Sequence, residues 1–177
     1  MSNLLRLEKG IETECGSEEM EIIRGIAYKK RELSEWEKDI VRYLHAVASK
    51  YILTHRPLDK VALPHDMLVI PEMENTILRP EIAMTVNGHD FPGWVVEFAD
   101  PEQDEISYLA KASIYRHAGV QEYWVIDASK KMLTSYLYEK RGWIPNCYDS
   151  PQRIKVSIYK ELYFSYSDIF AKREETE

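Results

Sequence analysis

An ionisable residue lies inside an apolar segment that otherwise predicts a strand buried on both faces. Residues 94–99 read WVVEFA, with Glu97 as the one charged side chain. A short, nearly continuous apolar run of this kind is typical of a central strand in a covered sheet. Burying the ionised carboxylate of Glu97 is costly unless a cation or strong hydrogen-bond donors compensate it. The segment therefore predicts both the centre of the fold and a place where charged partners converge.

Length and composition predict a single globular domain. The chain has 177 residues, of which 45% are hydrophobic and 11% aromatic, so it can bury a substantial core. We expect an N-terminal arm over residues 1–20, one domain over 21–171 and a charged tail over 172–177. The sequence has no apolar stretch long enough for a membrane span and no export signal. Its two cysteines, Cys15 and Cys147, are far apart, which favours a reducing, cytoplasmic location.

The order of the predicted elements is hairpin, helix, several strands, helix, and further strands. Arg24-Gly25 supplies the turn of a hairpin over residues 21–28. Ser34 and Glu37 form a capping-box pattern at the start of a helix that runs to about residue 52. A second helix is expected from Asp104 to about residue 118. Strands are expected at 61–63, 67–70, 77–78, 82–86, 94–99, 123–126, 132–138, 142–144 and 154–159, with a short turn or helix in 164–170. This order predicts an α/β (α+β) fold, a mixed β-sheet flanked by helices with an N-terminal β-hairpin.

Three charged residues are expected to converge on one site. On a helical wheel, Lys111 lies in the middle of the stripe of the second helix that faces the sheet. Only a short connection separates this helix from the strand of Glu97, so the two side chains can meet. Glu81 heads the preceding apolar run, and an antiparallel pairing would place it beside Glu97. Two carboxylates hold Mg²⁺ or Mn²⁺ through oxygen, and the lysine can orient water or stabilise charge on phosphorus.

Less specific interpretations of these residues remain open. Glu97 and Lys111 could form a structural ion pair with Glu81 at the surface. The net charge of −7 argues against indiscriminate nucleic-acid binding, although local basic strips can offset it. Candidate strips are Lys29-Lys30-Arg31, Lys130-Lys131 and Lys140-Arg141, each more typical of a solvated turn. Tyr123 and Trp124 are expected in the core, with Glu122 exposed or just behind the site.

Several of these segments together resemble a known family. Arg79-Pro80-Glu81, Trp94–Phe98 and above all the stretch from Lys111 to Asp127, which contains GVQEYWVID, resemble the Uma-two type restriction endonucleases of the PD-(D/E)xK nuclease superfamily. The similarity runs from about residue 20 to 170. It implies a restriction-endonuclease-like core in which Glu81 and Glu97 hold the metal. The superfamily lysine usually lies two residues after the second acid, where this chain has Ala99, and Lys111 matches the lysine relocated to the helix. Glu21 matches a further family acid, with an exposed strand glutamate as the alternative.

The chain also departs from the family pattern. Glu81 replaces the usual aspartate, Ala99-Asp100-Pro101-Glu102 replaces Ser-Pro-Ser-Thr, and Ser107 replaces an aspartate. The leading hypothesis is a Mg²⁺- or Mn²⁺-dependent endonuclease acting on DNA, with a homodimer as the form that cuts both strands. The alternatives are a catalytically inactive binding or interaction protein on a nuclease fold, and a metal-dependent hydrolase of a small phosphorylated substrate.

Overall fold

The computed structural model describes residues 20–62, 68–70, 73, 75–100 and 105–171. The predicted arm, apart from its last residue, and the predicted tail lie outside the described residues, as do Cys15 and the predicted helix cap Asp104. Cys147 is exposed and forms no disulfide. No helix in the described part of the chain combines the length and the apolar character needed to cross a bilayer.

The elements follow the predicted order. The described helices are α1 (Glu35–His55), α2 (Glu105–His117) and α3 (Tyr166–Ile169). The described strands are β1 (Met20–Ile23), β2 (Ile26–Lys29), β3 (Lys60–Ala62), β4 (Leu68–Val69), β5 (Ile77–Leu78), β6 (Ile82–Thr85), β7 (Trp94–Phe98), β8 (Glu122–Asp127), β9 (Met132–Glu139), β10 (Gly142–Tyr148), β11 (Arg153–Lys155) and β12 (Tyr163–Ser165).

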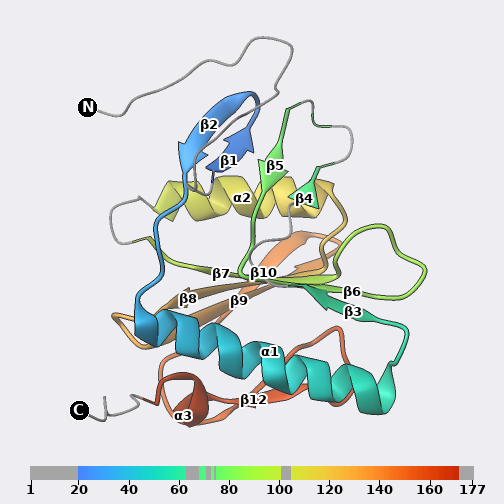
Figure 1. The fold of residues 1–177 in the computed structure, drawn as a ribbon, viewed down its shortest axis with the longest axis vertical. Helices are drawn as coiled ribbons and strands as arrows, with labels where there is room; N and C mark the ends of the chain where they lie inside the picture. The colour runs from blue at the N-terminus through green and yellow to red at the C-terminus, as the bar shows by residue number, and fades with distance from the viewer. Residues whose placement is uncertain (1–19, 63–67, 71–72, 74, 101–104, 172–177) are drawn as a thin grey trace.

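A six-stranded mixed sheet forms the centre of the structure. Its order is β10-β9-β8-β7-β6-β3, and β7 and β8 pair in parallel while the other described pairs are antiparallel. Helix α2 makes the crossover between β7 and β8, as a parallel pair requires. It lies on one face of the sheet and α1 lies on the other (Figure 1). A smaller antiparallel sheet, ordered β2-β1-β5-β4, lies beyond α2 and carries the N-terminal hairpin (Figure 1).

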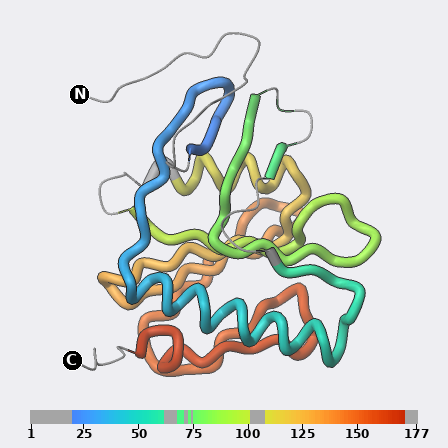
Figure 2. Tube along the Cα trace, in the orientation of Figure 1, coloured from blue at the N-terminus to red at the C-terminus, as the bar shows by residue number. Residues whose placement is uncertain are grey.

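Two stretches of chain tie the small sheet to the large one. Residues 77–82 lead from β5 into β6, and residues 30–34 descend from the hairpin past the end of β7 to the start of α1 (Figure 2). Both stretches carry charged residues that the site uses. The connections therefore bring residues far apart in the sequence to the same end of β7.

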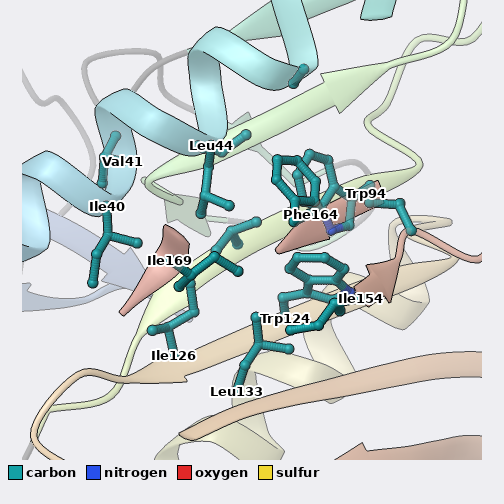
Figure 3. Close-up of a cluster of buried hydrophobic side chains, with 14 of the residues drawn as sticks. Ile40, Val41, Leu44, Trp94, Trp124, Ile126, Leu133, Ile154, Phe164 and Ile169 are labelled. Carbon is teal, nitrogen blue, oxygen red and sulfur yellow. The ribbon is translucent and has the colours of Figure 1, made fainter. Parts of the chain in front are cut away.

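The two faces of the central sheet bury different groups. In β7, Trp94, Val96 and Phe98 point toward α1 and join the larger apolar cluster, whereas Val95 belongs to the cluster on the α2 side. The alternation is that of a regular strand, so Glu97 points to the α2 side as well. Figure 3 shows the larger cluster, in which α1, the sheet and the C-terminal segment meet. The predicted double-sided burial of this strand is confirmed, since all five of its residues are buried.

Two expectations about the second half of the chain are wrong. The strand expected over residues 154–159 ends at Lys155, and a turn follows in which the amide of Tyr159 donates to the carbonyl of Val156. Glu122, expected to be exposed or just behind the site, is 0% exposed and points to the α1 side. Its carboxylate accepts hydrogen bonds from Trp124 Nε1 at 2.7 Å and from the Ile158 amide at 3.2 Å. These donors make the burial of Glu122 tolerable, and they attach the C-terminal segment to the sheet.

The capping box at the start of α1 is confirmed and is extended by an arginine. The Ser34 side chain accepts from the amide of Glu37 at 3.3 Å, and Glu37 Oε2 accepts from the amide of Ser34 at 2.9 Å. Arg31 donates to both oxygens of Glu37, at 2.9 and 2.6 Å, and to the carbonyl of Ala99 at 2.9 Å. This contact joins the helix start to the end of β7.

These contacts predict a pH-dependent contribution to stability. Burial by itself raises the pKa of Glu37, but the hydrogen bonds from Arg31 and Ser34 outweigh burial and leave the pKa below its ordinary value. A carboxyl whose pKa is lower in the folded state stabilises the fold above the unfolded pKa, and it loses this effect as the pH falls through the folded pKa. We expect Glu37→Gln to destabilise the protein by about 1 kcal/mol at pH 7, and by progressively less below about pH 4.3. Urea unfolding over this range checks the result. The exposed Glu32→Gln serves as control, and a cost for Glu37→Gln that stays constant with pH would contradict the assignment.

Candidate functional site

Glu81 and Glu97 lie side by side on the α2 face of the large sheet. Strands β6 and β7 pair antiparallel, and the amide of Glu81 donates to the carbonyl of Val96 at 2.9 Å just before β6 begins. Glu81 Oε2 accepts from the amide of Phe98 at 3.3 Å, which holds the carboxylate against the strand of Glu97. Each glutamate is 2% exposed. The alternative that places Glu81 at the surface is therefore wrong.

Lys111 bridges two carboxylates from different parts of the chain. Its Nζ lies 2.8 Å from Glu97 Oε2 and 2.7 Å from Glu21 Oε2. Tyr115, one turn further along α2, donates to Glu97 Oε1, and the Tyr123 hydroxyl on β8 lies 3.4 Å from Glu97 Oε2. The structure thus brings together the residues that the helical wheel and the strand pattern predict to converge.

Glu21 belongs to the same cluster and is not an exposed strand residue. It is buried in β1, and its Oε1 accepts from the amide of Arg79 at 2.9 Å. The hairpin therefore supplies a second acid that pairs with Lys111. Since Glu21 is contributed by the small sheet, the site is complete only when the two sheets pack on either side of α2.

Sequence reasoning missed Lys30 as a member of the site. Its Nζ lies 2.6 Å from Glu81 Oε1, with 12% of the lysine side chain exposed, and it also donates to the carbonyl of Arg79. The expectation of a solvated turn at Lys29-Lys30-Arg31 is wrong for Lys30, and Arg31 is likewise engaged in contacts with Glu37 and Ala99. No periodic pattern marks residues 30–34. The only signal for Lys30 is its position directly after a hairpin that carries a candidate acid.

These charged groups line one cavity. The cavity has a volume of about 200 Å³ and is bounded by β1, the segment after β2, the ends of β6 and β7, and α2. Its charged lining includes Glu21, Lys30, Glu81, Glu97 and Lys111. A space of this size accommodates several water molecules, each of which occupies about 30 Å³.

Burial and neighbouring charges push the pKa values of the two central acids in opposite directions. Burial raises the pKa of both, but for Glu97 the attraction of Lys111 and Lys30 outweighs burial and the pKa is lowered. For Glu81, burial and repulsion from Glu97 outweigh Lys30, and the pKa is raised. Burial by itself lowers the pKa of Lys111, but Glu97 and Glu21 outweigh it, so the net pKa is raised. The two carboxylates therefore favour the protonated form of Lys111.

The donor set fits a hard divalent cation held by few protein ligands. Among the described residues no group of three or more acidic, histidine or cysteine side chains is arranged around a common metal position. Glu81 and Glu97 nevertheless offer carboxylate oxygens on adjacent strands beside a cavity. Mg²⁺ is usually bound by one or two carboxylates, with water and substrate oxygens completing the octahedron. The chemistry of the pair suits this mode and does not suit zinc, which prefers nitrogen and sulfur.

The architecture is an α+β fold whose mixed sheet has a β7–α2–β8 crossover and carries two acids and a lysine on its α2 side. The fold is similar to a crystal structure from Anabaena variabilis ATCC 29413, described as "a putative nuclease belonging to DUF820", with a TM-score of 0.70. The two sequences are 20% identical, and the match covers 92% of this chain and 93% of the other. The fold class expected from the sequence is confirmed.

The sequence itself matches a family model over residues 3–162. The model is described as "Uma2: Putative restriction endonuclease", and the chain belongs to this family. No curated protein matches the sequence significantly. The family and the fold together support a nuclease, and the predicted family resemblance is confirmed.

Proposed function

We propose that the protein is a divalent-metal-dependent endonuclease that hydrolyses phosphodiester bonds of DNA. Glu81 and Glu97 would hold Mg²⁺ or Mn²⁺. The observation that carries the proposal is the pair of buried carboxylates on adjacent strands, which open on a cavity whose walls include their ion-pair partners Lys30 and Lys111. Burying several carboxylates in one cluster costs desolvation free energy that a purely structural role rarely recovers. Ionisable groups with shifted pKa values in a cavity are typical of active sites.

Each residue has a distinct part in this proposal. A bound cation would polarise the phosphoryl group and supply hydroxide from a bound water. Lys111, which stays protonated, stabilises the negative charge that develops on the phosphoryl oxygens as water attacks phosphorus and the P–O bond breaks. Glu21 positions Lys111, since it shares the ammonium group with Glu97. Tyr115 holds the other oxygen of Glu97 and so fixes the orientation of that carboxylate.

The proposal extends to the assembly and its location. A single site of this kind cuts one strand at a time, so cleavage of both strands of a duplex is proposed to need a homodimer. The location proposed is the cytoplasm, in line with the two widely separated cysteines. Sedimentation analysis with and without a DNA duplex would test the dimer independently of activity.

One observation favours a second candidate, a nuclease-fold binding protein without turnover. The acids of the site already carry protein donors, with Lys30 on Glu81 and Lys111 on Glu97. Such pairing neutralises the carboxylates in the way a structural polar cluster would. The two candidates differ in whether a divalent cation displaces these internal partners.

The direct test measures metal binding and cleavage separately. Purified protein is titrated with Mn²⁺ by calorimetry and incubated with single- and double-stranded DNA, RNA and small phosphodiesters in the presence of Mg²⁺ or Mn²⁺. We expect metal binding that is lost in Glu97→Ala, together with metal-dependent cleavage of DNA. Metal binding without cleavage of any substrate would favour the binding protein. The absence of both would refute the metal-dependent nuclease.

If Lys111 stabilises the transition state as a cation, its removal should slow DNA cleavage. We expect Lys111→Met to reduce the rate of DNA cleavage by about 10²–10³-fold, the effect of removing one preorganised electrostatic group, whereas Lys111→Arg retains part of the activity. Single-turnover rates at saturating metal provide the measurement, and circular dichroism verifies the fold. The exposed Lys60→Met on β3 serves as the charge control. An equal loss in Lys111→Met and Lys60→Met would contradict a specific role.

A further inference from the structure

We propose that Lys30 is a mobile active-site cation, which neutralises Glu81 in the metal-free protein and turns to a substrate phosphate once Glu81 serves as a metal ligand. This inference rests on the proposed function and adds Lys30 to the residues that take part in it. The contact that carries it is the ion pair between Lys30 Nζ and Glu81 Oε1, at 2.6 Å, on the wall of the cavity.

Lys30 and a bound metal ion would compete for the same carboxylate, that of Glu81. Glu81 Oε2 already accepts from the amide of Phe98 in β7, so Oε1 is the oxygen with the more adaptable partner. That partner is the Lys30 ammonium group. A divalent cation and an ammonium group cannot occupy the same side of one carboxylate without strong repulsion. Metal coordination by Glu81 must therefore weaken or break its contact with Lys30.

Lys111 and Lys30 differ in the partners they would keep if a carboxylate of the site became a metal ligand. Lys111 pairs with Glu97 and also with Glu21, so it keeps one carboxylate if the other becomes a ligand. Within the described residues, Lys30 has its ion pair with Glu81 alone, supplemented by the carbonyl of Arg79. Lys30 also follows β2 in a segment that belongs to no helix or strand. Lys30 is consequently the lysine that can leave its partner.

The charge of the cavity favours a contact between a released Lys30 and a substrate phosphate. When all are ionised, the four acids that line the cavity (Glu21, Glu81, Glu97 and Asp100) balance its four basic residues (Lys29, Lys30, Arg31 and Lys111). A bound divalent cation would therefore leave the cavity with a net positive charge, which attracts a phosphodiester anion. A released ammonium group that faces this cavity is well placed to bind the phosphate oxygen, as lysines commonly do.

The Glu81 carboxylate contacts both the amide of Phe98 on β7 and the ammonium group of Lys30 on the hairpin side of the cavity. The glutamate and the lysine thus form a matched pair. An ion pair with a purely structural role does not need to face a cavity, yet Lys30 and Glu81 line one together with Glu97.

The test uses metal affinity measured in the absence of nucleic acid. We expect Lys30→Met to tighten Mn²⁺ binding by at least about fivefold, or about 1 kcal/mol, in calorimetric titrations near neutral pH, because the competing ammonium group is gone. Lys60→Met, which removes an equal charge from an exposed position on β3 of the same sheet, should change the affinity by less than about twofold. Unchanged or weaker Mn²⁺ binding in Lys30→Met would overturn the competition between Lys30 and metal.

A second arm tests the phosphate contact. In Ca²⁺, as a probe cation chosen to allow binding without turnover, fluorescence anisotropy gives the affinity for a labelled DNA duplex at several salt concentrations. We expect Lys30→Met to weaken binding and to reduce the salt slope by about 0.9, the effect of one lost phosphate contact. Lys30→Arg should restore both. A wild-type slope in Lys30→Met would overturn the phosphate contact.

Wild-type protein provides a measurement that does not depend on the folding of a variant. The side-chain ammonium signal of Lys30, assigned by its loss in Lys30→Arg, should shift on titration with diamagnetic Mg²⁺ while that of Lys60 does not. A signal that stays unchanged at saturating metal would refute the inference. If the wild-type protein binds no metal at all, the proposed function fails; if it binds metal and cleaves DNA with Lys30 unmoved, only the role of Lys30 fails.

Discussion

Replacing Glu97 by glutamine should reduce metal-dependent cleavage by at least about a thousandfold, equivalent to about 4 kcal/mol of transition-state stabilisation, while the protein stays folded. The substitution keeps the size of the side chain and removes its charge. It also takes from the site the acid whose pKa is lowered by Lys111 and Lys30 and which is therefore ionised at neutral pH. A neutral amide is a much poorer ligand for a hard divalent cation than a carboxylate.

The fold is expected to survive because most contacts of residue 97 allow an amide. Lys111 can donate to the amide oxygen in the position of Oε2, and the amide NH2 in the position of Oε1 can donate to the Tyr115 hydroxyl, which then accepts. Lys111 also keeps its second carboxylate, Glu21. The apolar residues of β7 on the opposite face are not touched by the change.

The measurement compares single-turnover cleavage rates with Mn²⁺ affinities in wild type and Glu97→Gln. Glu139→Gln, an exposed glutamate at the end of β9, is the matched control and should leave both quantities unchanged. A Glu97→Gln variant that binds Mn²⁺ like the wild type would show that Glu97 is not a ligand. Loss of metal affinity in both variants would point to a general charge effect.

Local patterns were sufficient to predict the central part of the site. The apolar context of Glu97 and the helical position of Lys111 are properties of single elements, and they correctly predicted a buried strand and a helix face turned toward it. The adjacency of Glu81 followed from the turn between two strands, because antiparallel neighbours in sequence usually pair in space. Each of these inferences needed only one element or one short connection.

The parts that the sequence did not reveal depend on long-range packing. Lys30 meets Glu81 across 51 positions because the segment after β2 runs along the end of β7 (Figure 2), and no periodicity encodes that path. Glu122 begins a strand, where exposure is common, and its burial depends on Trp124 and on the amide of Ile158 in the C-terminal segment. Charged residues are the hardest to place from sequence, since their burial depends on partners that are remote in the chain.

Truncation of Phe164 to alanine should cost about 3–5 kcal/mol of stability, the usual range for a fully buried aromatic side chain. Phe164 lies in β12 and is 1% exposed. Its ring centroid lies 5.7 Å from that of Trp94 and 5.6 Å from that of Trp124. A third ring, that of Tyr43 on α1, lies 6.1 Å away. Phe164 therefore links the C-terminal segment, α1 and the two central strands (Figure 3).

The free energy of unfolding in urea provides the measurement, with Tyr163→Ala as control. Tyr163 is the preceding residue, is exposed and stacks on Arg153, so its loss should cost less than about 1 kcal/mol. Phe164→Leu, which keeps an apolar side chain of smaller volume, should fall between the two. A cost below about 1 kcal/mol for Phe164→Ala would show that the cluster closes over the missing ring.

The same variant separates the two faces of the sheet. Phe164 contacts the side of β7 that carries Trp94, whereas Glu97 points to the α2 side. As long as Phe164→Ala remains folded, its Mn²⁺ affinity per folded molecule should equal that of the wild type. A large loss of metal affinity without unfolding would mean that packing on the α1 side sets the geometry of the carboxylates, because a shift of β7 moves both of its faces together.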